Sequence, residues 1–188
     1  MFRALIFTGL LSLFFGPALA KPQDYNFDYS ASEIIFTYDF NGEAVKGKFP
    51  KFEGDLVLDF QNVRNSKINV SINTASAQGG FIFATSALRG PKILFAKKFP
   101  AIIFKSQSAI LKNGVALIKG QITIRGVTRP ITLTARFFNF ADKDPKDRDE
   151  LAVKISGAIN RHDFDASGYP NMVGETLAIN IMARIKRR

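Results

Sequence analysis

The chain contains no cysteine and no tryptophan, and His162 is its single histidine among 188 residues. Without cysteine the protein forms no disulfide and has no thiol chemistry. Zinc sites draw on clusters of Cys, His and carboxylate side chains, and one histidine without cysteine offers no such cluster. We therefore expect no metal site, and we expect the fold to depend on its apolar core alone.

Motifs for catalysis are also missing. No G-x-S-x-G sequence places a nucleophilic serine on a sharp turn, and His162 adjoins Asp163, where neighbouring side chains usually point apart. Gly79-Gly80 lacks the Lys-Ser/Thr pair that completes a phosphate-binding loop. The acid-rich loop 142–150 interleaves its acids with Lys and Arg and lacks the spacing of a calcium loop. We predict a protein that is not an enzyme, with no catalytic residue and no cofactor.

The first 20 residues have the pattern of a secretory signal peptide. Arg3 gives a positive start, residues 4–15 are mostly apolar, and Ala18-Leu19-Ala20 ends the segment with small residues. The alternative, a retained membrane anchor, is disfavoured because a span needs about 20 apolar residues. We expect cleavage after Ala20, export of the chain, and a single domain over residues 21–188.

Basic residues outnumber acidic ones by 26 to 16, which gives the chain a net charge of +10. A basic surface attracts nucleic acid, anionic lipid or an anionic ligand head group, and export argues against nucleic acid. The alternative is that scattered Lys and Arg keep an apolar chain in solution. Of the 19 Phe residues, only four lie in the first 20 residues, so the mature domain has an aromatic-rich interior.

Apolar residues alternate with polar ones along most of the mature chain, which is typical of strands with one buried face. Turn residues at Asn41-Gly42, Asn113-Gly114 and Gly126 separate these segments. Strands that follow one another without helices favour antiparallel sheets in a barrel or a sandwich. The pattern predicts strands at residues 34–40, 55–60, 67–73, 102–106, 121–125, 131–137, 151–156 and 176–185, with a further one near 44–49.

Residues 80–96 break the alternation and predict one or two short helices. The first candidate, F-I-F-A-T-S-A-L-R, ends at Gly90, and Pro91 suits the first position of a second helical turn. Their apolar side chains must be covered, so we expect this segment to plug or cap one side of a barrel.

Four strings in the mature chain resemble the YceI-like family of lipocalin-like, polyisoprenoid-binding proteins. They are G-K-F-P-K-F-E-G at 47–54, S-A-L at 86–88 followed by Phe95 and F-P-A-I-I-F-K-S at 99–106, G-Q-I-T-I-R-G-V-T-R-P at 120–130, and I-N-R-H-D-F at 159–164. The resemblance spans roughly residues 25–185. It implies an all-β, antiparallel eight-stranded lipocalin-like barrel in the periplasm, which carries or sequesters an isoprenoid lipid.

Two positions depart from the family pattern. Asp165 stands where the family often has glycine, and residues 79–83 are more apolar than usual. The chain also lacks the Gly-x-Trp mark of true lipocalins, so the likeness to lipocalins is one of architecture. Arg161 and Asp163 are two residues apart, and on a strand they would share a face and pair.

Alternation and the resemblance together predict the inward-facing residues of a lipid cavity. An eight-stranded barrel is either filled by side chains or holds one small ligand, and alternation does not choose between these. Basic residues near the helical cap are head-group candidates: Arg89, Lys92, Lys97 and Lys98. The cavity candidates are Ile34, Phe36, Leu58, Val70, Phe83, Leu88, Leu94, Phe104, Ile122, Leu133, Phe137, Val153, Ile155 and Ile179.

The resemblance implies a long-chain isoprenoid, either a polyprenyl chain or an isoprenoid quinone, as ligand. We expect this lipid as the one bound group, no nucleic acid, and at most transient membrane contact, with a homodimer left open. Two other functions remain alternatives. One is a filled barrel that acts in protein interaction or stress response, and the other is an exported hydrolase.

Overall fold

The computed structural model describes residues 21–140, 144 and 146–188. The predicted signal peptide, residues 1–20, therefore lies outside the described residues, as do positions 141–143 and 145 of the acid-rich loop. Within the described chain the residues form ten strands and one α-helix, α1. The strands are β1 (Gln23–Phe27), β2 (Glu33–Phe40), β3 (Glu43–Lys48), β4 (Phe52–Leu58), β5 (Lys67–Asn73), β6 (Ala101–Lys112), β7 (Val115–Ile124), β8 (Val127–Phe138), β9 (Glu150–Asn160) and β10 (Thr176–Arg187).

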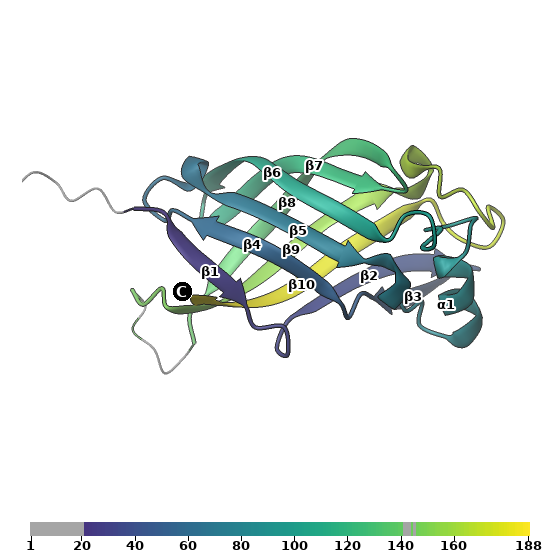
Figure 1. Cartoon of the computed structure of the whole chain (residues 1–188), viewed down its shortest axis with the longest axis horizontal. Helices are drawn as coiled ribbons and strands as arrows, with labels where there is room; N and C mark the ends of the chain where they lie inside the picture. The colour runs from purple at the N-terminus through teal and green to yellow at the C-terminus, as the bar shows by residue number, and fades with distance from the viewer. Residues whose placement is uncertain (1–20, 141–143, 145) are drawn as a thin grey trace, which may run out of the picture.

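Eight of these strands close into an antiparallel barrel, which confirms the architecture that the resemblance implied (Figure 1). The ring runs β1-β4-β5-β6-β7-β8-β9-β10 and closes where β1 pairs with β10. The β2–β3 hairpin continues the ring, because β2 pairs with the other half of the same β10 edge. Strand β1 closes the ring through three paired positions with β4 and three with β10.

Strands β9 and β10 form the longest pairing of the barrel, and their register does not shift along it. β9 and β10 pair without interruption from Thr176 opposite Asn160 to Lys186 opposite Glu150. Since side chains alternate between the two faces of a strand, this register holds every second residue inside. The buried or half-buried positions Leu151, Val153 and Ile155 of β9 accordingly face the interior, which confirms the alternation in the sequence.

Strand β1 was not predicted from the sequence. It has only five residues, with Tyr25 fully buried in its centre, and it is too short to show a clear alternation. A turn at Asp28 separates it from β2: the Ser30 and Ala31 amides both donate to the Asp28 carboxylate. Two strands with a break between them, β1 and β2, therefore pair with the same side of β10.

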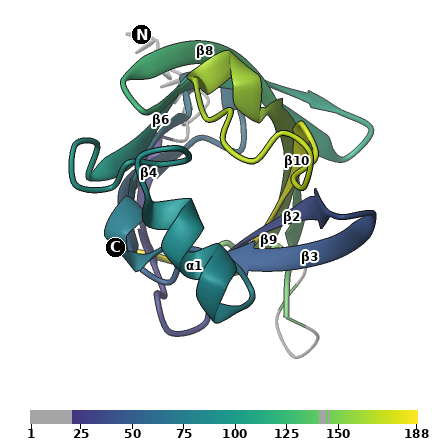
Figure 2. The ribbon, with the colours of Figure 1, turned by 90° about the vertical axis from the view of Figure 1, so that its right-hand side faces the viewer.

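The helical segment is shorter than the sequence allowed. Helix α1 (Ile82–Arg89) ends at Gly90, and Pro91 begins a series of turns instead of a second helix. Short 3-10 turns complete the described structure: η1 (Val63–Asn65), η2 (Thr74–Ser76) and η3 (Arg161–Phe164). Figure 2 shows the barrel end on, with α1 across one side of the ring and the loop after η3 across the other. Helix α1 therefore covers part of one end of the barrel.

The described residues contain no helix with the length and apolarity that crossing a bilayer requires.

Candidate functional site

The inner faces of the strands enclose an apolar cavity of about 240 Å³. Among the residues described, only Tyr38, Arg161 and Tyr169 bring an oxygen- or nitrogen-bearing side chain to its lining. The Tyr38 hydroxyl donates to the Gly79 carbonyl at 2.7 Å, and burial raises the pKa of this phenol. Its polar atom is therefore already bonded to the protein. The cavity offers a ligand apolar contact and very little hydrogen bonding.

Protein side chains do not fill this interior. Val70, Ile72, Ile179 and Ile181 point into the barrel, yet each is only half-buried because part of its surface borders the cavity. Small residues contribute to the space: Ala135 and Ala183 lie on its wall where larger side chains would occupy it. The barrel therefore contains a cavity and is not filled by its side chains. The alternation of residues in the sequence had not distinguished these two cases.

All fourteen residues predicted for the cavity lie on its wall. Eleven come from strands, and Phe83, Leu88 and Leu94 come from α1 and the turns after it. Their role as ligand contacts stays a prediction. Alternation could also have found Tyr38, Ile118 and Ile185, whereas Ala166, Tyr169, Met172 and Val173 lie in a loop without periodic signal.

The cavity meets the solvent beside α1. Phe83 is 56% exposed and is the most exposed residue of the lining. Its ring packs edge-on against Tyr169 with 6.3 Å between the centroids, and the Lys92 ammonium lies 5.6 Å from the centre of the Tyr169 ring. Phe83 from the helix and Tyr169 from the opposite loop therefore meet across the opening.

Two aromatic residues at this end have strained backbones. Tyr169 has a φ of 58° and Phe95 has a φ of 50°. Bulky side chains rarely adopt this left-handed region, which costs about 1–3 kcal/mol and persists only where the surroundings enforce it. Asp165, at φ 56°, occupies the same region, which explains structurally why glycine suits this position.

Arg161 holds the loop after η3 in its conformation through side-chain hydrogen bonds. It is 4% exposed, and its guanidinium donates to the carbonyls of Gly174 (3.0 Å), Ala166 (2.5 Å), Gly168 (2.7 Å) and Val173 (2.9 Å). Burial lowers its pKa, and the Glu175 carboxylate opposes part of that shift. The predicted pairing of Arg161 with Asp163 is wrong, because the chain turns into η3 here instead of continuing as a strand.

Two further arginines fix the other side of the opening. Arg125 donates to the Pro91 and Ile93 carbonyls, both at 2.7 Å, and so ties the turns after α1 to the β7–β8 hairpin. Arg89 Nε donates to the Ala77 carbonyl at 2.8 Å and anchors the end of α1. Arginines bonded to backbone carbonyls thus hold the end of α1, the turns after α1 and the loop after η3.

The YceI-like domain model matches residues 25–185, which covers nearly all of the barrel. The chain belongs to the YceI-like family. It is 31% identical over 169 residues to the UPF0312 protein VPA0850 of Vibrio parahaemolyticus, a match that covers 88% of this chain and 89% of the relative. With a UPF0312 protein of Vibrio campbellii it shares 32% identity over 149 residues, which cover 77% of this chain and 78% of that protein.

Solved structures share the fold of this YceI-like chain. BcnA of Burkholderia cenocepacia superposes with a TM-score of 0.76 at 16% identity and covers 85% of this chain and 99% of its own. A polyisoprenoid binding domain of Saccharophagus degradans, implicated in plant cell wall breakdown, superposes with a TM-score of 0.63 at 11% identity, covering 87% and 98%. At these identities the likeness shows the architecture alone.

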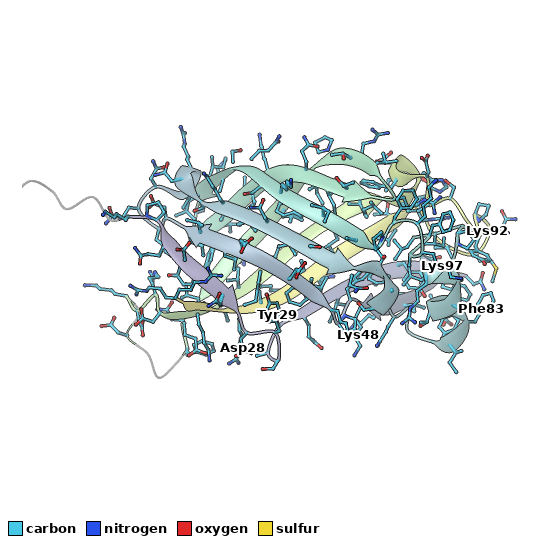
Figure 3. The ribbon with its side chains drawn as sticks, in the orientation of Figure 1. Asp28, Tyr29, Lys48, Phe83, Lys92 and Lys97 are labelled. Carbon is cyan, nitrogen blue, oxygen red and sulfur yellow. The ribbon has the colours of Figure 1, made fainter. Side chains whose placement is uncertain are left out.

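The predicted head-group residues lie at the open end of the YceI-like barrel. Figure 3 shows Lys92 and Lys97 at the same end as Phe83. The Lys98 ammonium lies 5.2 Å from the centre of the Phe99 ring, and Arg89 is the last residue of α1, with its Nε bonded to the Ala77 carbonyl. Lys92, Lys97 and Lys98 are exposed. Their binding of a lipid head group stays a prediction.

The described residues hold no group of three metal-ligating side chains. His162 lies in η3, where its backbone N–H donates to Asn160 Oδ1 at 2.9 Å and helps to begin this turn. The string at residues 159–164 that contains His162 therefore has a role in local structure.

We predict that Arg161→Ala lowers the free energy of unfolding by about 3 kcal/mol, because several buried carbonyls lose their donor at once. Arg161→Lys should restore little of this, since an ammonium cannot reproduce the fork of donors. Urea denaturation measures both. Arg136→Ala, on the exposed face of β8, is the control and should change stability by no more than about 0.5 kcal/mol. A lysine variant as stable as the original chain would contradict this role.

Proposed function

We propose that the protein binds a long-chain isoprenoid lipid, a polyprenyl chain or the tail of an isoprenoid quinone, in the barrel cavity. The observation that carries this proposal is the apolar cavity of about 240 Å³ whose few polar lining groups are largely bonded to the protein. Membership of the YceI-like family supports it, and so does the polyisoprenoid-binding neighbour of the same architecture.

The physical basis of the binding is apolar burial. An isoprenoid chain has no hydrogen-bonding groups along its length, and an aliphatic and aromatic wall leaves no polar atom unsatisfied against it. At about −0.3 kcal/mol per heavy atom, a fully enclosed chain of about 30 carbons would gain roughly −9 kcal/mol, which corresponds to a sub-micromolar Kd, and a partly enclosed chain gains less.

The cavity also limits how much of the lipid is enclosed. Its volume of about 240 Å³ is below the roughly 300–1,000 Å³ of typical pockets for small molecules. A long isoprenoid must therefore push side chains apart or leave part of its length outside. The opening beside Phe83 is where the polar head would remain in water, close to the exposed Lys92 and Lys97.

We further propose that the chain acts in the periplasm and that it binds its ligand without transforming it. The support for export is the pattern of residues 1–20, and the support for binding without catalysis is the lack of a recognisable catalytic motif in the sequence.

The absence of tryptophan from the chain allows a direct test of cavity binding. Ile179 points into the cavity, whereas the adjacent Ala178 on β10 is exposed outside. We expect Ile179→Trp to fill the lumen, to fluoresce at short wavelength, and to weaken binding of a polyprenyl alcohol at least tenfold. The matched variant Ala178→Trp should fluoresce as a solvent-exposed indole and bind the lipid like the original chain.

Equal lipid affinity in the two tryptophan variants would contradict binding in the barrel. Circular dichroism and urea denaturation show whether each variant is folded, so a loss of binding through unfolding is recognised.

Export gives a second prediction. When the full chain is expressed in a bacterium with two membranes, the periplasmic fraction should contain a protein that begins at Lys21, as read by its intact mass and N-terminal sequence. Substitution of Ala18 and Ala20 by large residues should block this processing, because signal peptidase requires small side chains near the cleavage site. A chain that keeps residues 1–20 and stays in the cytoplasm would refute the proposed localisation.

A further inference from the structure

Three consecutive apolar residues protrude at the open end of the barrel. Phe81, Ile82 and Phe83, here called the apolar tip, lie at the start of α1 and are 39%, 91% and 56% exposed. Figure 3 shows Phe83 at the same end of the molecule as Lys92 and Lys97. Large apolar side chains that are exposed together usually mark a surface that meets a partner or a membrane.

The tip is held in place by the protein. Phe81 packs against Phe40 with 5.3 Å between ring centroids, and Phe83 packs against Tyr169. Between these two fixed rings, Ile82 is almost fully exposed. The tip is therefore built into the fold, and the side chain of Ile82 has no described protein surface to cover it.

Positive charge surrounds the apolar tip. The segment from residue 78 to residue 100 contains Arg89, Lys92, Lys97 and Lys98 and no acidic residue. On the other side of the tip, Lys46 and Lys48 of β3 share a surface groove with Phe81, Ile82 and Arg89. Across the opening, the loop after β9 instead carries the exposed acids Asp163 and Asp165. The β2–β3 hairpin also carries the exposed acids Asp39 and Glu43, whereas the charged residues that share the groove with the tip and those that follow it in sequence are basic.

Exposed apolar side chains with basic residues beside them favour one kind of binding partner for the tip. A second copy of the chain would bring its own basic residues against these six, so the approach would be repelled. An anionic bilayer complements them, because each Lys or Arg near such a surface strengthens attachment about fivefold. Aromatic and aliphatic side chains on an amphipathic helix insert at the boundary between head groups and acyl chains. We propose that the apolar tip docks on the anionic surface of a lipid bilayer.

Docking would place the cavity opening on the membrane. Phe83 belongs to the tip and also lines the cavity, so apolar surface continues from the bilayer into the barrel. This consequence rests on the proposed lipid binding: an isoprenoid could pass between membrane and cavity without crossing water. The docking itself does not require an occupied cavity, and the two proposals can therefore fail separately.

Vesicle flotation tests the docking. The chain from Lys21 to Arg188, which contains every element of the barrel, is mixed with vesicles of phosphatidylcholine alone or of phosphatidylcholine with phosphatidylglycerol. We expect it to float with the anionic vesicles only, and to be released as salt is raised, because salt screens the attraction. Ile82→Glu should weaken binding at least tenfold. Leu111→Glu, which introduces the same charge at another exposed aliphatic residue (57%) near the β6–β7 turn, should bind like the original chain.

The double variant with Lys46 and Lys48 changed to Gln tests the charge, because these lysines lie beside the tip and do not line the cavity. It should bind at least tenfold more weakly while keeping the affinity of the cavity for a polyprenyl alcohol in detergent. No flotation of the original chain, equal flotation with neutral vesicles, or equal flotation of Ile82→Glu would each overturn the docking. A dimer in light scattering that Ile82→Glu dissociates would also overturn it, because the tip would then be an interface between copies. In each case the tryptophan pair still reports separately on the cavity.

Discussion

Closure of the antiparallel sheet is the constraint on which the rest of the structure depends. Because β1 pairs with both β4 and β10, the sheet closes into a ring whose inner face is lined almost entirely by apolar side chains. The unbroken register of β9 and β10 then keeps every inward position apolar. A closed ring of eight strands is wide enough that side chains such as Ala135 and Ala183 leave space inside it.

The open end depends on a second set of interactions, between arginines and backbone carbonyls. Loops at a barrel mouth have carbonyl groups without sheet partners, and Arg161, Arg125 and Arg89 supply the missing donors. The four bonds of Arg161 fix the loop in which Tyr169 adopts its strained backbone. The ring of Tyr169 meets Phe83 at the opening, so the arginine network determines the shape of the entrance to the cavity.

Much of the barrel could be predicted from the sequence, because every second residue is apolar in a strand with one buried face. The alternation found the cavity wall of β2, β9 and β10, and the break near residue 80 located the cap. The five-residue strand β1 was too short for this signal.

Local turns explain the remaining differences. Arg161 was expected to pair with Asp163, but η3 turns the chain, and the arginine bonds with distant carbonyls that no spacing reveals. The segment after Pro91 forms turns because Gly90 and the left-handed Phe95 interrupt a second helix. The loop residues Tyr169 and Met172 reach the cavity through tertiary packing alone.

We propose that the apolar cavity in the described barrel holds one isoprenoid chain. Native mass spectrometry of the chain, purified without detergent and exposed to bacterial membrane lipids, tests this binding most directly. Binding in the lumen predicts one adduct per chain whose mass is built from isoprene units, lost when Ile179→Trp fills the lumen and kept in Ala178→Trp. A chain that remains at its bare mass, or that carries the same adduct in both variants, would contradict it.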